Sequence, residues 1–178
     1  MTILRENFRP VGDVLPVVRR DFPLADKQLA NPENPLSLYD GEWMTLDSSY
    51  KLVRACDVTD DSTPAEPAAG ALCFPLWAEN GRFDIQAMAD RKPPLLWMGN
   101  WEFETRVFDP AVAAGSGAAI TTLWQPVKVA TVVIGTRNFV GLVGHGGAGV
   151  DSALIVGYVT KLSSDNGGWL RIRGGFGF

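Results

Sequence analysis

His145, the only histidine of the chain, lies in a glycine-rich run at 144–149, a combination that could belong to a hydrolase. In some esterases such a run forms part of the oxyanion hole, but those enzymes also need a GxSxG serine and a separate histidine base. Ser116 has a glycine directly on each side, but no glycine at the positions two residues before and after it that the GxSxG motif requires. No lysine or helical pattern follows the run, so it does not match a phosphate loop. We therefore expect 144–149 to be a loop between strands, in which the glycines allow backbone conformations that other residues rarely adopt.

Glu102 and Glu104 could act as a pair of carboxylates, because they are two residues apart in an alternating segment. Neighbours of this kind on one strand lie about 6.6 Å apart, a separation that overlaps the range for glycosidase carboxylates. Glycosidase carboxylates face each other across a cleft, however, whereas these two stand side by side. Arg106 continues the same face. We therefore expect a solvated ladder of charges and no catalytic residues.

Metal binding is a third chemistry to consider, because the loop at 57–70 collects several carboxylates. It has neither the glycine at the bend nor the closing bidentate glutamate of an EF-hand. Cys56 and Cys73 lack the CxxC spacing of a zinc site, and are either two free thiols at strand edges or a bridge that closes the 57–72 loop. We expect no metal and no cofactor. The carboxylates of the loop are Asp57, Asp60, Asp61 and Glu66.

The six tryptophans are many for 178 residues. Tryptophan stacks on sugar faces and anchors protein interfaces, but most members of such a set belong to a core. Trp97 and Trp101 follow a Pro-Pro pair and have Met98 between them. They are the two that we expect at a surface.

The composition predicts one ordered domain. Hydrophobic residues make up 46% and charged residues 20%, both ordinary for a globular protein, and 19 glycines with 12 prolines favour turns over long helices. The net charge of −4 and the pI near 5.0 argue against binding to nucleic acid. No apolar run is long enough for a membrane span, and we expect no signal peptide, so synthesis in the cytoplasm is predicted.

Alternation and β-branched runs predict the strands that would carry these residues. At 101–107, apolar residues or threonine alternate with charged ones, which indicates an antiparallel sheet with one wet face. Apolar runs at 127–134, 139–143 and 154–162 follow, and Gly157 within the last indicates a bulge or a close approach. Two short strands at 41–47 and 50–55 form a predicted hairpin. We predict an all-β fold, an antiparallel barrel or sandwich of about nine short strands.

Residues 1–23 are predicted to be an extended N-terminal arm, and residues 24–178 the β domain. The first twenty residues have four arginines against Glu6 and Asp13, so their charge of +2 is opposite to that of the whole chain. Prolines at 16 and 23 exclude a central strand around 14–22. An arm of this kind lies either on its own domain or on a partner subunit.

Three segments resemble the small β-barrel decoration (cement) proteins of tailed bacteriophage capsids. They are GEWMTLDSSYKLVRA at 41–55, VGYVTKL at 156–162 and GWLRIR at 168–173. The resemblance brackets most of the domain, and its motifs are structural. It implies a non-enzymatic protein, often a homotrimer, that binds the outside of an icosahedral shell and bridges neighbouring major capsid proteins.

This resemblance implies a location on the outer capsid surface of the virion. The acidic composition and the lack of a long apolar run predict no nucleic-acid or membrane partner. It does not carry over which end meets the shell, because arms and loops vary within the family. An alternative is a carbohydrate-binding β-sandwich module in which Trp97 and Trp101 form the stacking platform, with Glu102 or Asn100 as hydrogen-bonding partners. The residues expected to contact the capsid or another subunit are Arg5, Phe8, Arg9, Val14, Leu15, Val17, Val18, Phe22, Trp97, Trp101, Phe176 and Phe178.

Overall fold

The computed structural model describes residues 7–11, 17–19, 22–26, 38–59, 67–68, 71–77, 95–98, 101–111, 118–146 and 154–174. Within these ranges, no helix is long and apolar enough to cross a membrane. The elements are β1 (Phe8–Val11), β2 (Val17–Arg19), β3 (Trp43–Leu46), β4 (Leu52–Arg54), β5 (Phe74–Pro75), β6 (Leu95–Met98), β7 (Trp101–Thr105), β8 (Pro126–Ile134), β9 (Arg137–Gly144), β10 (Ile155–Lys161), the 3-10 turn η3 (Ser163–Asp165) and β11 (Leu170–Gly174).

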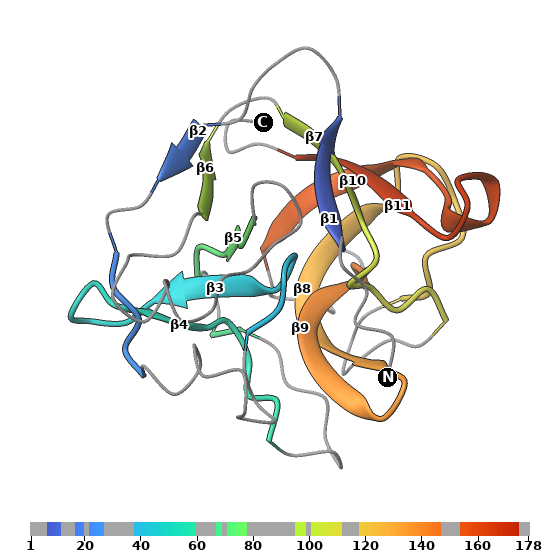
Figure 1. The fold of residues 1–178 in the computed structure, drawn as a ribbon. Helices are drawn as coiled ribbons and strands as arrows, with labels where there is room; N and C mark the ends of the chain where they lie inside the picture. Colours follow the sequence, from blue (N-terminus) through green and yellow to red (C-terminus); the bar gives the residue numbers. More distant parts are fainter. Residues whose placement is uncertain are drawn as a thin grey trace.

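The strands form three sheets in which all neighbouring strands are antiparallel (Figure 1). A six-stranded sheet has the order β1-β7-β11-β10-β8-β9, a three-stranded sheet has the order β4-β3-β5, and β2 pairs with β6. The two larger sheets contain nine strands, so the prediction of an all-β antiparallel fold with about nine strands is confirmed. The sheets do not close into a barrel, and the fold is sandwich-like.

The long hairpin of β8 and β9 follows from its β-branched sequence, which suits a pleated, buried surface. Residues 127–132 are all buried, so both faces of this part of β8 are covered. Ile134 pairs with Arg137, which leaves only Gly135 and Thr136 in the turn. Gly135 has φ +68°, a conformation that favours glycine in tight hairpins. Gly135 thus permits a two-residue turn between β8 and β9.

The hairpin of β10 and β11 confirms the prediction at Gly157. The pairing of β10 with β8 shifts register between Ile155 and Gly157, which is a bulge. A Cβ on Gly157 would also lie 2.6 Å from Cγ2 of Ile172 and 2.8 Å from the carbonyl oxygen of Arg173. Only a residue without a side chain fits this contact between strands.

The predicted hairpin at 41–55 is present as β3 and β4. Its turn is held by Asp47, whose Oδ1 accepts the N–H groups of Ser49 at 2.8 Å and Lys51 at 2.9 Å. An aspartate that bonds its own following backbone is a common way to close a turn. The local sequence therefore determines this hairpin.

The main core lies where the three-stranded sheet meets the six-stranded sheet. Trp43 of β3 approaches Phe103 of β7 with ring centroids 6.1 Å apart, and Phe103 stacks on Phe8 of β1 at 4.6 Å. Met44, the next residue after Trp43, belongs to a second core cluster with Leu52, which includes Leu24, Leu38, Phe74 and Leu76. Successive strand residues point to opposite faces, so the three-stranded sheet is covered on both sides.

The described parts of the predicted arm pair with strands of the same chain. β1 is an edge strand of the six-stranded sheet, and β2 pairs with β6. The Phe8 side chain is 1% exposed in the main core, so its prediction as a capsid or subunit contact is wrong: the ring is enclosed by its own domain. The N–H of Phe8 donates to Asp40 Oδ2 at 3.1 Å, and Pro10 has no N–H, so this edge is protected against pairing with another strand.

Candidate interaction surface

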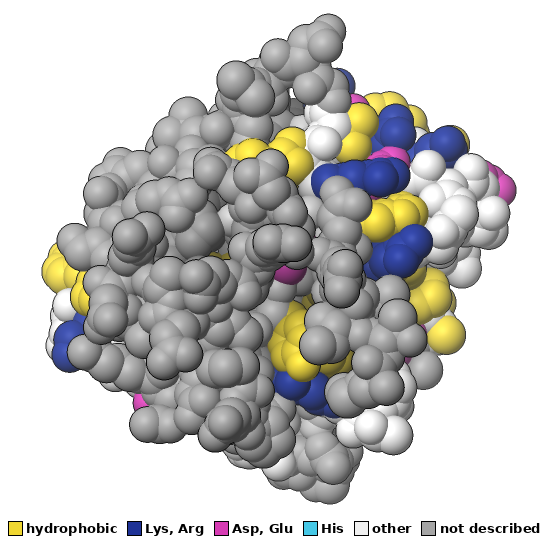
Figure 2. Space-filling model, viewed as in Figure 1, with side chains coloured by type: hydrophobic (Ala, Val, Ile, Leu, Met, Phe, Trp, Pro, Cys, Tyr) yellow, Lys and Arg dark blue, Asp and Glu magenta, His cyan; other side chains and the backbone are white. Residues whose placement is uncertain are grey.

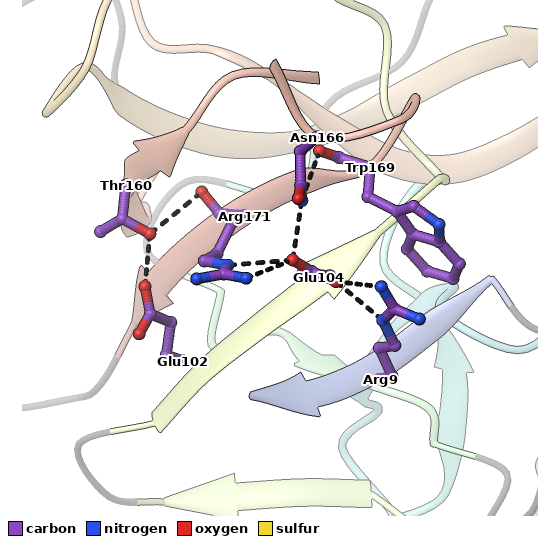
Figure 3. Close-up of polar contacts among 7 residues, drawn as sticks. All are labelled: Arg9, Glu102, Glu104, Thr160, Asn166, Trp169 and Arg171. Atoms are coloured by element: carbon purple, nitrogen blue, oxygen red, sulfur yellow. Dashed lines mark hydrogen bonds and ion pairs between the residues drawn. The ribbon is translucent and has the colours of Figure 1, made fainter. Parts of the chain in front are cut away.

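Glu102 and Glu104 both lie on β7, but Glu104 is no part of a solvated ladder. Its side chain is 2% exposed. Oε2 accepts from Arg9 Nε at 2.7 Å and pairs with Arg9 Nη2 at 2.6 Å. Oε1 accepts from Arg171 at 2.7 and 2.9 Å and from Asn166 Nδ2 at 2.7 Å (Figure 3). The expectation of a solvated carboxylate is therefore wrong at Glu104, because three side chains from neighbouring elements cover it.

The hydrogen bonds to Glu104 set its ionisation. Burial is the largest single influence and raises the pKa, but the bonds from Asn166, Arg171 and Arg9 together outweigh it, so the pKa lies below its usual value. Both oxygens are occupied by donors, so this carboxylate is badly placed to exchange protons with a substrate. It joins β1, β7, β11 and the turn after η3 as a structural cross-link.

Trp169, which is buried beside this cluster, lies against two guanidinium groups. The Cζ atoms of Arg9 and Arg106 are each 4.4 Å from the centroid of its ring. On the same strand as Glu104, Glu102 accepts a hydrogen bond from the Thr160 hydroxyl at 2.5 Å. Charged and aromatic groups therefore hold one another in fixed positions on this part of the sheet.

The strand register places several positively charged side chains on one face of the six-stranded sheet. Arg9 pairs with Glu104, which pairs with Arg171, while Glu102 pairs with Arg173. Figure 2 shows Lys and Arg side chains gathered beside hydrophobic ones over the region of β1, β10 and β11. This charge is opposite in sign to the net −4 of the chain. We call Arg9, Arg106, Lys161, Arg171 and Arg173 the cationic face.

A second buried carboxylate, Glu42, escapes the sequence analysis entirely. Glu42 is 0% exposed, and Arg54, with a side chain 8% exposed, donates to it at 2.9 and 3.1 Å. The N–H groups of Tyr39 and Val140 donate to the same carboxylate at 2.9 and 3.3 Å. The only sequence signal is that Glu42 and Arg54, which have opposite charges, lie just before β3 and at the end of β4. Glu42 links this hairpin to β9.

The structure also describes two further candidates of the sequence analysis, His145 and Asp57. His145 is buried just after β9, where its backbone N–H donates to the Pro126 carbonyl at 2.9 Å. Residues 147–149 of the glycine-rich run lie outside the described residues. Asp57 Oδ1 accepts from the N–H and the hydroxyl of Thr59, and these bonds lower its pKa. Across the described ranges, no three His, Cys, Asp or Glu side chains are grouped to hold a metal.

Of the two alternatives for the cysteines, the structure has the free thiols. Cys56 and Cys73 are both buried in the main core cluster. Burial raises the pKa of Cys73 to about 12. A buried neutral thiol behaves as a small apolar group.

Both thiols are expected to resist modification in the folded protein. At pH 8, their reaction with Ellman's reagent should be at least about 100-fold slower than that of an unfolded cysteine, because the thiolate is the nucleophile and burial disfavours it. The absorbance of the released thiolate, followed with and without guanidinium chloride, measures the ratio. Fast reaction of either cysteine under native conditions would contradict the burial described here.

The remaining predicted contact residues fall into three groups. Phe22 is partly buried against the second core cluster, and Arg9 belongs to the Glu104 cross-link with 43% of its side chain exposed. For four others the structure describes only the backbone: Val17 and Val18 in β2, Trp97 in β6 and Trp101 in β7. Arg5, Val14, Leu15, Phe176 and Phe178 lie outside the described residues.

The most exposed tryptophan that the structure describes is Trp124, which the sequence analysis does not single out. Trp124 is 63% exposed and the neighbouring Leu123 is 54% exposed. The two form the end of the loop that precedes β8, and we call them the tip. The only sequence signal near it is the break at Gln125 and Pro126.

Comparison of the chain with protein-family models, with curated proteins and with solved structures finds no match.

Proposed function

We propose that this chain is a non-enzymatic structural protein of a phage virion, which decorates an icosahedral capsid and bridges neighbouring major capsid proteins. The sequence resemblance at 41–55 and 156–173 supports it, and these segments form the β3–β4 and β10–β11 hairpins of the two larger sheets. The resemblance therefore concerns the framework of the domain. The proposal also includes a homotrimer on the outer capsid surface.

The observation that carries the proposal is how the described polar groups are used. Glu42, Glu104 and Asp40 are buried, and their oxygens accept hydrogen bonds from other elements of the chain. The tip is exposed, and the cationic face is partly exposed: Arg173 is exposed, as is 43% of the Arg9 side chain. A rigid framework that directs apolar and cationic side chains to its surface suits a binding protein, whose energy comes from contact area and repeated attachment to a shell.

The test measures the native mass of the purified chain and its co-sedimentation with empty shells of the phage that it is proposed to decorate. Deleting the whole predicted arm would remove Phe8 from the core, so the variant to compare is a deletion of residues 1–5, which precede β1. We expect the full chain to bind at a saturating stoichiometry and the deletion to bind more weakly, because it removes the predicted contact Arg5. A monomeric chain that does not sediment with shells would overturn the proposal, and glycan binding would then be measured.

A further inference from the structure

Trp124 has a backbone conformation that a bulky residue rarely adopts. Its φ is +61°, in the left-handed region that favours glycine and asparagine. Its side chain is 63% exposed, so burial of the indole does not compensate for this strain. A strained residue persists only where its surroundings hold it, and such residues are common at binding sites.

Hydrogen bonds on both sides hold the residue in this conformation. The N–H of Trp124 donates to the Val159 carbonyl at 2.7 Å, and the N–H of Val159 donates to the Gln125 carbonyl at 3.0 Å. The Gln125 side chain then closes the loop: Oε1 accepts from the N–H groups of Thr121 and Thr122 at 2.9 and 3.3 Å. The tip is thus tied to β10 and to its own loop.

The base of the loop is packed closely on the end of β9. The N–H of Ala118 donates to the Gly144 carbonyl at 2.8 Å. A Cβ on Gly144 would overlap the Ala118 carbonyl oxygen and lie 2.7 Å from Gln125 Nε2. Ile120, between these contacts, is buried. The loop is therefore formed before any partner arrives, which lowers the entropic cost of binding.

The chemistry of the loop indicates what it binds. Residues 118–125 contain no charged side chain. Gln125 uses both ends of its amide within the loop, because Nε2 also donates to the Ala119 carbonyl at 2.6 Å. The amide of Gln125, the polar group next to the indole, is therefore committed to the loop. Leucine and tryptophan presented together suit an apolar pocket of another protein, where tryptophan is enriched among the residues that dominate affinity.

We propose that the tip, Leu123 and Trp124, is a preformed anchor that inserts into an apolar pocket on the outer surface of the shell protein. This inference rests on the proposed function and adds to it the residue that carries most of the affinity. The strained backbone directs the indole outward, and the bonds of Gln125 keep it there.

The substitution Trp124→Asn tests the anchor without disturbing the fold, because asparagine tolerates positive φ. In the full chain, W124N is expected to raise the thermal midpoint by about 2 to 4 °C through relief of strain. Its binding to empty shells in the co-sedimentation assay should be at least about 30-fold weaker, the effect of losing a dominant contact. A stabilised protein that no longer binds is a result that a purely structural tryptophan would not give.

Tyr50 provides a matched control, because it is also an exposed aromatic residue, at 72%, with a positive φ of +57°. Y50N should bind shells like the wild-type chain. Equal binding of W124N and wild type, or equal losses in W124N and Y50N, would overturn the anchor while leaving the proposed function in place. Failure of the wild-type chain to bind shells would instead overturn the proposed function, and this inference with it.

Discussion

Replacement of Glu42 by alanine should lower the free energy of unfolding by about 4 to 5 kcal/mol, the upper end of the effect of breaking a buried ion pair. The value is high because both partners are enclosed: Glu42 is 0% exposed and the Arg54 side chain 8%. The variant leaves a guanidinium without its carboxylate in the interior. It also removes the acceptor for the N–H groups of Tyr39 and Val140.

Urea unfolding followed by tryptophan fluorescence measures this loss. The double variant E42A/R54M removes both charges of the pair and should recover part of the stability, because much of the cost in E42A comes from a buried guanidinium that has lost its carboxylate. E102Q is the matched control: Glu102 is half-buried and accepts one bond, from Thr160, in the described structure, so about 1 kcal/mol or less is expected. A loss in E42A no larger than in E102Q would show that the pair is not a cross-link.

Short-range patterns in the sequence predict much of the fold. Alternation at 101–107 gives β7, the β-branched run gives β8, and the polar turn at Asp47 gives the β3–β4 hairpin. Gly157 is predicted as a bulge because a glycine interrupts an apolar strand. Each of these depends on residues that are close together in the chain.

The sites could not be predicted in this way, because they depend on distant partners. Alternation places Glu104 on the polar side of β7, but its donors are 62 to 95 residues away in sequence, so its burial is not visible locally. Glu42 and Val140 are 98 residues apart. Phe8 looks like an arm residue until β1 pairs with β7. Trp124 is one of six tryptophans, and its exposure and backbone conformation, which distinguish it, are visible only in the structure.

Glu42, Glu104 and the tip belong to one connected framework of strands. Glu42 joins the three-stranded sheet to β9, and Glu104 joins β1 to β11. The tip loop is bonded to β10 and to the end of β9 within the same framework. A framework that holds the tip loop in place lowers the entropic cost of binding, in keeping with the role proposed for the tip.

The Glu104 cross-link gives stability that depends on pH. E104Q should lose about 3 kcal/mol at pH 7, the lower end for a buried pair, because Arg9 and Arg171 can still reach water. The pKa of Glu104 is lowered from 4.5 in the folded state, so its carboxylate stabilises the fold above that value and this contribution is lost as the pH falls below it. The difference between wild type and E104Q should therefore shrink below pH 4.5.

Urea unfolding of both proteins from pH 7 down to pH 3 measures this difference, and other titrating groups cancel because both chains carry them. D57N serves as a comparison, since the pKa of Asp57 is also lowered, by Thr59, but its carboxylate is exposed and joins no other element of the described structure. Its effect at pH 7 should be clearly smaller than that of E104Q. A gap between wild type and E104Q that stays constant over the whole range would mean that the charge of Glu104 does not hold β1, β7 and β11 together.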